Sequence, residues 1–290
     1  MVPVGEAALD PRDRGFTLGD GLFETIRVRD GRPLLVDLHL ARLRAGAGQI
    51  GLSRVPNDET LCDAIRTTLE ANGLSDAAVR LTVSRGVPAN RGLLSKPEPA
   101  PSLVVHAQPF AGYPAELYSR GMRATISRIP RNERSPLTRV KALSYLDNVL
   151  ARREADTRGA DEALMLNTAG HLACASAANL FLARGETLLT PDAESGVLPG
   201  TVRGLVLAEL APQMGLTVVE RPVRTEELAT ADEAFLTSAL LGVMPLTEVD
   251  GLSVGTDGPG PISSSLRTDL EKSCSSEGCE TTGSPSGGPL

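Results

Sequence analysis

Residues 196–203 read Gly196-Val197-Leu198-Pro199-Gly200-Thr201-Val202-Arg203, a glycine-bounded loop that runs directly into a predicted helix. We expect this helix from Gly200 to Met214, with Gly215 ending it. The first backbone N–H groups of a helix have no partner within the helix, and the helix dipole adds positive potential there. The stretch therefore predicts a cradle for a phosphate group. A plain helix start has the same pattern, so the cradle needs a chemical partner elsewhere in the chain.

A lysine supplies that partner. The 29 basic residues include only three lysines, at positions 96, 141 and 272, and the other 26 are arginines. Lys96 stands among prolines in a predicted loop and Lys272 borders a polar tail, which leaves Lys141 in the structured interior. The neighbours of Lys141 at positions 140, 142 and 143 are apolar, and removal from water favours the neutral amine that Schiff-base chemistry requires. With Arg42 as a second phosphate ligand, these features indicate pyridoxal phosphate.

The composition is that of a globular protein. The chain has 290 residues, of which 41% are hydrophobic, enough to bury one large core or two ordinary ones. A formal net charge of -7 has the wrong sign for binding nucleic acid. No apolar run approaches the roughly 18 residues that span a bilayer, and acids and prolines occupy the N-terminus where a secretion signal would be basic and apolar. We expect a cytoplasmic protein with neither nucleic-acid nor membrane partners.

The cysteines and histidines do not predict a metal site. Four cysteines are present, none in a C-x-x-C pair and none clustered with the three histidines. Two of them, Cys274 and Cys279, lie in a C-terminal stretch rich in Ser, Gly and Pro, which we expect to be a disordered tail over residues 273–290. Neither a disulfide framework nor a zinc site is expected.

The first third of the chain predicts a small N-terminal α/β domain over residues 1–107. An alternating strand at 22–28 runs into Asp30-Gly31, a strong hairpin signal, with the return strand beginning at Leu34-Leu35. Helices are expected from Asp37, as the capping residue, to Leu52, and from Asn57 to Ala71. Strands at 78–84 and 103–107 follow, separated by a long polar loop of the kind that is usually functional.

Residues 108–114 read as an interdomain linker because they place two prolines and a glycine between strand patterns. Residues 115–272 then predict a larger, β-rich domain. It contains a helix from Leu143 to Arg158, which we expect to turn Leu146, Val149 and Leu150 inward, and a last helix at 261–272. The fold class is α/β (α+β) in two lobes, with strong antiparallel hairpin character.

Five motifs in order resemble the class IV aminotransferase family, the fold type IV pyridoxal-phosphate enzymes. These are Asp13-Arg14-Gly15-Phe16 with Gly19-Asp20-Gly21-Leu22-Phe23-Glu24-Thr25, His39-Leu40-Ala41-Arg42-Leu43, Lys141 with Tyr145-Leu146-Asp147-Asn148-Val149-Leu150, Ala177-Ala178-Asn179-Leu180-Phe181, and residues 196–203. The resemblance runs from about residue 13 to 270. It implies a homodimer that acts on a small amino substrate, with the long loop of the small domain near the partner's site.

The resemblance also implies roles for individual residues. Lys141 matches the catalytic Schiff-base lysine, Arg42 the phosphate-binding arginine, and Tyr145 a tyrosine near the cofactor's phenolic oxygen. Leu198 matches the residue that packs on the cofactor ring, and Thr201 and Val202 match donors to its phosphate. The expected cofactor site consists of Arg42, Lys141, Tyr145, Cys174, Leu198, Thr201, Val202, Ser238 and Ala239, and the expected substrate contacts are Glu24, Arg27 and Arg91.

Cys174 departs from the family pattern. It stands five residues before Asn179, where the family has a glutamate that pairs with the pyridine nitrogen. A thiol with an ordinary pKa of about 8.5 is mostly neutral and a weak acceptor, so it does not hold a pyridinium proton. A weakened electron sink disfavours transamination more than a lyase reaction that ends by forming an aromatic ring. The pattern at Ser238-Ala239-Leu240 resembles the aminodeoxychorismate lyase branch, which releases pyruvate and 4-aminobenzoate.

Two alternatives stay open. One is an aminotransferase for a D-amino acid, a branched-chain amino acid or an amine that works with a neutral pyridine. The other is a degenerate homologue without pyridoxal-phosphate chemistry. The retention of Lys141, Arg42 and the glycine-rich loop argues against the second alternative, because drift would be expected to erode them as well.

Overall fold

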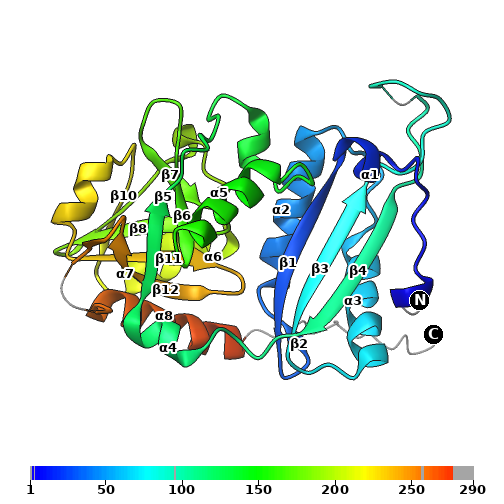
Figure 1. Cartoon of the computed structure of the whole chain (residues 1–290). Helices are drawn as coiled ribbons and strands as arrows, with labels where there is room; N and C mark the ends of the chain where they lie inside the picture. Colours follow the sequence, from blue (N-terminus) through cyan, green and yellow to red (C-terminus); the bar gives the residue numbers. More distant parts are fainter. Residues whose placement is uncertain (1, 3, 95, 256–257, 277–290) are drawn as a thin grey trace, which may run out of the picture.

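The computed structural model describes residues 2, 4–94, 96–255 and 258–276, and places them in two lobes joined side by side (Figure 1). The smaller lobe is an antiparallel four-stranded sheet with the strand order β2-β1-β3-β4. Its strands are β1 (Gly21–Arg29), β2 (Arg32–Pro33), β3 (Ala77–Ser84) and β4 (Ser102–Pro109). A short helix, α1 (Arg14–Leu18), precedes them.

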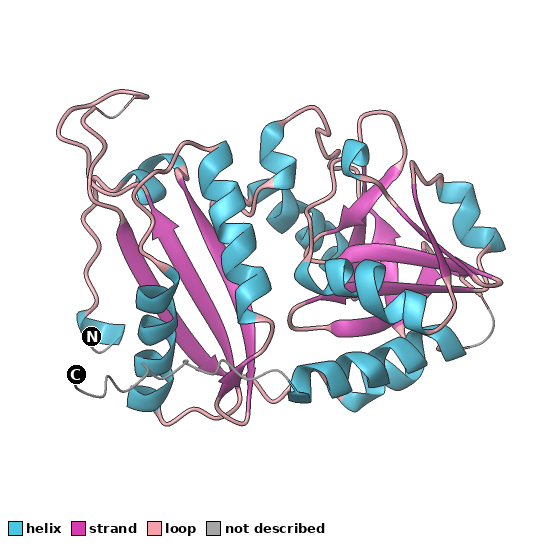
Figure 2. Ribbon diagram, turned by 180° about the vertical axis from the view of Figure 1, so that it is seen from behind, coloured by secondary structure: helices cyan, strands magenta, loops and turns pink. Residues whose placement is uncertain are grey.

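Helices α2 (Val36–Gln49) and α3 (Asp58–Asn72) cover one face of this sheet, as Figure 2 shows from behind. Because side chains alternate along a strand, every second residue of β1 faces these helices, and Leu22, Ile26 and Val28 are fully buried against them. The helix α3 begins as expected, since the Asn57 side chain accepts a hydrogen bond from the backbone N–H of Thr60.

The hairpin differs in detail from the expectation. Asp30 and Gly31 both adopt positive φ angles, 49° and 75°, as a two-residue turn between twisted strands requires. The return strand is only Arg32–Pro33, and the expected strand at Leu34-Leu35 was wrong. Leu35 instead precedes α2 and packs into an apolar cluster of the larger lobe, and this burial ends the strand pairing early. Asp37 therefore lies in the first turn of α2 and does not cap it.

The larger lobe is built on a mixed sheet with the strand order β10-β9-β8-β11-β12-β5-β6-β7, and β13 pairs with β12. The strands are β5 (Met122–Ile126), β6 (Glu162–Leu166), β7 (Leu172–Ala175), β8 (Asn179–Arg184), β9 (Thr187–Thr190), β10 (Thr217–Glu220), β11 (Glu233–Ser238), β12 (Gly242–Val249) and β13 (Leu252–Ser253). The helices are α4 (Ala115–Arg120), α5 (Leu146–Thr157), α6 (Thr201–Leu205), α7 (Ala211–Gln213) and α8 (Pro261–Ser276). A π-helical turn, Val206–Leu210, joins α6 to α7.

The orientation of α5 overturns the expectation for its apolar face. Leu146, Val149 and Leu150 are 66%, 48% and 38% exposed, so they do not point inward. The buried face carries Ala151 and Ala155, which pack with small residues of β6 and β7. Alanine side chains allow the helix to approach the sheet closely, and leucines at the same positions would not fit in that space.

The ends of the expected domains also differ from the structure. Strand β4 runs on to Pro109, two residues into the expected linker. Helix α8 continues to Ser276, past the expected boundary at residue 272, because Leu266, Leu270 and Cys274 form one buried stripe at four-residue spacing. Residues 277–290 of the expected tail lie outside the described part of the chain.

Among the described residues, none of the helices is long and apolar enough to cross a membrane. Within the same residues, no group of three or more His, Cys, Asp or Glu side chains is arranged to hold a metal ion.

Two substitutions test the orientation of α5. Ala151→Leu is expected to lower the free energy of unfolding by about 1–3 kcal/mol, because the larger side chain has no room against β6 and β7. Leu150→Ala is expected to change it by less than about 0.5 kcal/mol. Urea unfolding followed by circular dichroism measures both, and a larger cost for Leu150→Ala than for Ala151→Leu would contradict the assigned face.

Candidate active site

Lys141 is held at the junction of the two lobes by backbone pairing with the first strand. The N–H of Phe23 donates to the carbonyl of Lys141 at 3.0 Å, and the N–H of Leu143 donates to the carbonyl of Gly21 at 3.0 Å. Leu22 and Ala142 thus form an antiparallel bridge between β1 and the segment that carries the lysine. The Lys141 Nζ lies 4.3 Å from the centre of the Phe23 ring. The amine position is therefore set by the main chain as well as by packing.

The surroundings of Lys141 favour its neutral form. Burial lowers the pKa of the amine to about 8, and the positive charges of Arg42, Arg80 and Arg131 act in the same direction, against Glu24. At pH 7 about one amine in ten is then neutral, compared with fewer than one in about a thousand for an ordinary lysine. The expected desolvation of Lys141 is thus present in the structure, and the reactive form of the amine is available near neutral pH.

A cavity opens around this amine between the lobes. Eight residues of the expected cofactor site line it, from α2, β7, β11 and the loops between them: Arg42, Lys141, Tyr145, Cys174, Leu198, Thr201, Ser238 and Ala239. Sequence reasoning did not single out several further residues of its wall, among them Phe23, Thr25, Arg80, Arg131, Asn148, Glu162 and Thr237. Four expected residues do not line it: Val202, Glu24, Arg27 and Arg91.

Glu24 lies behind the cavity wall and holds Arg42 in place. Its carboxylate accepts from Arg42 Nε at 2.9 Å and from Arg42 Nη2 at 2.5 Å, and it lies 2.7 Å from Nδ1 of His39. Burial raises the pKa of Glu24, but the hydrogen bonds from His39 and Arg42 outweigh it and hold the pKa below its usual range. Glu24 faces α2 on β1 and contacts Arg42, so the expected substrate contact is replaced by a supporting one.

The glycine-rich loop meets the same arginine. Arg42 Nη1 donates to the carbonyl of Pro199 at 3.1 Å, and the Asn179 side chain donates to the carbonyl of Leu198 at 3.0 Å. A Cβ atom at Gly200 would lie 2.0 Å from the Asn179 side-chain oxygen, so only glycine fits there. The loop is therefore fixed from two sides, with the first N–H groups of α6 left at the cavity.

Val202 turns its side chain away from the cavity. It is 3% exposed and packs in the apolar cluster of the larger lobe, so only its backbone N–H is available as a donor. Ser238 lies at the end of β11, where its hydroxyl accepts from the N–H of Leu241 at 3.2 Å. Thr237 precedes it, and the Thr237 hydroxyl is buried without a hydrogen-bond partner although it belongs to the cavity wall. A buried hydroxyl of this kind fits a wall that meets a polar ligand.

The far end of the cavity lacks a free carboxylate at the position of Cys174. Cys174 is 4% exposed, and burial raises the pKa of its thiol, so the sulfur is protonated at neutral pH. Glu162 also lines the cavity, but its carboxylate is occupied by the hydroxyl of Ser176 and by the N–H of Ala163 at 2.7 Å. Burial raises the pKa of Tyr145 to about 12, which keeps that phenol protonated.

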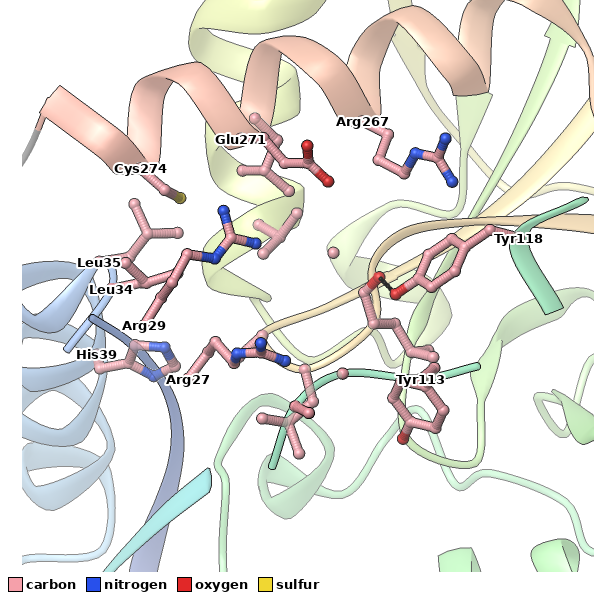
Figure 3. Close-up of a pocket in the computed structure, with 18 residues that line it drawn as sticks. Arg27, Arg29, Leu34, Leu35, His39, Tyr113, Tyr118, Arg267, Glu271 and Cys274 are labelled. Atoms are coloured by element: carbon pink, nitrogen blue, oxygen red, sulfur yellow. Dashed lines mark hydrogen bonds between the residues drawn. The ribbon is translucent and has the colours of Figure 1, made fainter. Parts of the chain in front are cut away.

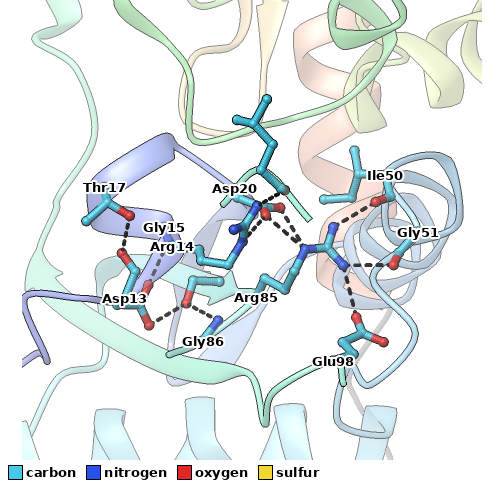
Figure 4. A network of polar contacts seen from close by, with 12 residues as sticks. Asp13, Arg14, Gly15, Thr17, Asp20, Ile50, Gly51, Arg85, Gly86 and Glu98 are labelled. Carbon is cyan, nitrogen blue, oxygen red and sulfur yellow. Dashed lines mark hydrogen bonds and ion pairs between the residues drawn. The ribbon is translucent and has the colours of Figure 1, made fainter. Parts of the chain in front are cut away.

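Arg91 lies in the loop between β3 and β4, which projects from the small lobe beyond the ends of these strands (Figure 1). A polar network holds the base of this loop (Figure 4). Asp20 accepts from Arg14 Nε at 2.7 Å and from Arg85 Nε at 2.9 Å, and Arg85 Nη1 donates to Glu98 at 3.0 Å. Arg91 is exposed and stands outside the cavity of its own chain.

The residues present fit a phosphorylated cofactor that bonds to an amine. Arg42, Thr201 and Ser238 offer donors at one end, Lys141 offers a buried amine of low pKa, and the unpartnered hydroxyl of Thr237 faces the same cavity. The cavity meets only Cys174 where the family pattern has its glutamate.

Comparison with known proteins gives a consistent result. A family model described as amino-transferase class IV matches residues 21–249. The D-alanine aminotransferase of Bacillus licheniformis is 29% identical over 97% of this chain and 97% of its own.

Two solved structures share the fold. The 4-amino-4-deoxychorismate lyase of Pseudomonas aeruginosa superposes with a TM-score of 0.83 and is 33% identical, covering 92% of this chain and 95% of its own. The T.th. branched-chain amino acid aminotransferase with pyridoxamine 5'-phosphate has a TM-score of 0.86 and 26% identity, covering 94% and 91%.

Cofactor uptake tests the state of Lys141. The rate at which the cofactor-free protein gains visible absorbance on addition of pyridoxal phosphate is expected to rise with pH and to reach half its plateau near pH 8, because the neutral amine is the reacting form. Stopped-flow absorbance measures the rate, and Lys141→Ala serves as the blank without the band. A midpoint near the ordinary lysine pKa of about 10.4 would contradict the desolvated amine.

Proposed function

The chain belongs to the class IV aminotransferase family and uses pyridoxal phosphate, and from this premise we propose that it is a lyase of the 4-amino-4-deoxychorismate type. The reaction releases pyruvate and leaves 4-aminobenzoate. Solved lyase structures and aminotransferases resemble the chain to similar degrees, so overall similarity does not favour either. The proposal rests on the site itself.

The observation that carries the proposal is the buried thiol of Cys174. Its raised pKa leaves a neutral group with little acceptor strength, so it cannot keep a proton on a pyridine nitrogen. The nearby carboxylate of Glu162 is satisfied by Ser176 and Ala163. A reaction that needs strong electron withdrawal is therefore disfavoured in this cavity, and one whose product gains aromatic stabilisation is favoured.

Each residue then has a role that its position supports. When bound, the cofactor supplies the electron sink for bond cleavage at the amine-bearing carbon of the substrate. Arg42, aligned by Glu24, holds the phosphate together with Thr201 and Ser238. The Lys141 amine, with a pKa of about 8, accepts a proton from the substrate carbon and returns it later.

Arg80 is positioned to bind a substrate carboxylate. It lines the cavity on β3, and its guanidinium lies 3.8 Å from the centre of the Phe23 ring, the same ring that contacts the lysine amine. Burial lowers the pKa of Arg80, which remains a cation, and a planar guanidinium binds carboxylates through two parallel hydrogen bonds. Both a chorismate-derived substrate and an amino acid present such a group.

An aminotransferase is the second candidate, and a specific observation favours it. The cavity is lined by a carboxylate-binding arginine, a lysine amine and the Thr237 hydroxyl, a set sufficient to bind a plain amino acid. In that case the enzyme works with an unprotonated pyridine and transfers the amino group to a keto acid.

The loop that carries Arg91 completes the proposal. We expect the chain to act as a homodimer in which this loop, fixed at its base by Arg85, reaches the partner's cavity and brings Arg91 toward the substrate there. The exposed leucines of α5 are consistent with such a contact.

The direct experiment incubates the purified, cofactor-loaded protein with aminodeoxychorismate. Pyruvate and 4-aminobenzoate are expected in equal amounts, with no need for a keto-acid acceptor, and Lys141→Ala should form neither. Liquid chromatography quantifies both products. Transfer of the amino group to 2-oxoglutarate without release of pyruvate would contradict the lyase and support the aminotransferase, and a colourless protein that takes up no cofactor would contradict both.

A further inference from the structure

A second cavity lies beside the first, on the other side of the turn that follows β11. Its wall combines residues of β1, α2, the interdomain segment, the β11–β12 turn and α8 (Figure 3). It shares Tyr113 and the turn residues Ala239, Leu240 and Leu241 with the cavity around Lys141, but Lys141 itself is not part of its wall. The Tyr118 hydroxyl donates to the carbonyl of Leu241 at 2.9 Å and fixes the shared turn.

Three arginines converge on this second cavity. Arg27 and Arg29 are two residues apart on β1, so their side chains leave the same face of the strand, and Arg267 reaches the cavity from α8 (Figure 3). Arg267 lies over the Tyr118 ring at 5.0 Å, and Arg27 over the Phe110 ring at 4.7 Å. Aromatic faces on one side of these guanidiniums leave their N–H edges available to a ligand.

Arg27 is the least satisfied of the three. Its side chain is only 11% exposed, yet its Nε has no hydrogen-bond partner in the described structure. Its nearest carboxylate, that of Asp76, is 4.0 Å away, at the limit of an ion pair. Burial lowers the pKa of Arg27, and the neighbouring charge of Arg29 lowers it further. A buried guanidinium of this kind is stabilised by an anion that supplies the missing acceptor.

The charge and shape of the cavity specify the ligand further. Against the three arginines, Glu271 of α8 is the one carboxylate among the described wall residues, so the wall keeps an excess of positive charge. Apolar side chains lie between the charged groups, among them Leu34, Leu35, Leu241 and Leu270. Separate guanidiniums joined by an apolar surface match two carboxylates joined by a short hydrocarbon chain, and match a single compact anion less well.

We propose that this second cavity, formed by Arg27, Arg29 and Arg267 beside the shared turn, is a binding site for a short dicarboxylate that is not the substrate in reaction with Lys141. The site goes beyond the proposed function and does not rest on it, because a lyase and an aminotransferase would share the same arginines. Bound there, a dicarboxylate contacts the back of the turn that carries Ala239, whose front faces the reaction cavity.

The test is isothermal titration calorimetry of the cofactor-loaded protein with glutarate. Glutarate has two carboxylates but no amino or keto group, so it takes no part in amino transfer. We expect saturable binding that weakens at least tenfold in Arg267→Gln and in Arg29→Gln. Inorganic phosphate, a compact anion, should bind at least tenfold more weakly than glutarate.

Two control variants locate the bound glutarate. Arg80→Gln changes the reaction cavity and should leave glutarate affinity within about twofold, as should Arg66→Gln on the exposed face of α3, where Arg66 pairs with Asp63 and Glu70. Thermal unfolding without glutarate confirms that each variant folds. Absence of glutarate binding, loss of binding in Arg80→Gln, unchanged binding in Arg267→Gln, or tighter binding of phosphate would each overturn the proposal.

Discussion

The backbone pairing of β1 with the segment around Lys141 is the constraint on which the site depends. Two hydrogen bonds of 3.0 Å join Phe23 to Lys141 and Leu143 to Gly21, and they tie the larger lobe to the first strand of the smaller one. The lysine amine is thereby fixed where both lobes exclude water, which lowers its pKa to about 8. Burial of a cation among arginines is costly, and the carboxylate of Glu24 offsets part of that cost by pairing with Arg42. Fold, charge balance and reactivity therefore depend on the same few residues of β1.

The two ends of the reaction cavity have opposite character. At the phosphate end, donors from Arg42, Thr201 and Ser238 converge, and Glu24 and Asn179 hold their supports in place. At the other end the wall is a buried thiol, and the nearest carboxylate is already hydrogen-bonded. The site is thus well built to bind a phosphorylated cofactor, and it leaves the ring nitrogen of that cofactor without a strong acceptor. This asymmetry separates the chain from the family pattern and underlies the proposed lyase chemistry.

Local signals in the sequence predicted the features that local physics decides. The Asp30-Gly31 turn, the Asn57 cap and the glycine loop before Thr201 depend on a few neighbouring residues, and each was found where expected. The inward face of α5 was not predicted correctly, because its leucines gave the stronger apolar signal while the close approach to the sheet selected alanines. Glu24 was placed at the substrate, although its alternation with Leu22 and Ile26 on β1 already indicated the α2 face. Arg80 was missed because an arginine in an alternating strand has the pattern of a solvent-facing residue, and only the packing of the lobes places it in a cavity.

The central claim is that Cys174 leaves the pyridine nitrogen of the bound cofactor unprotonated. The most direct measurement is the ¹⁵N chemical shift of that nitrogen in protein loaded with ¹⁵N-labelled pyridoxal phosphate, compared with the Cys174→Glu variant. The account predicts the shift of an unprotonated pyridine in the parent protein and the shift of a pyridinium in the variant, where a carboxylate returns to the cavity wall. A pyridinium shift in the parent protein would contradict it.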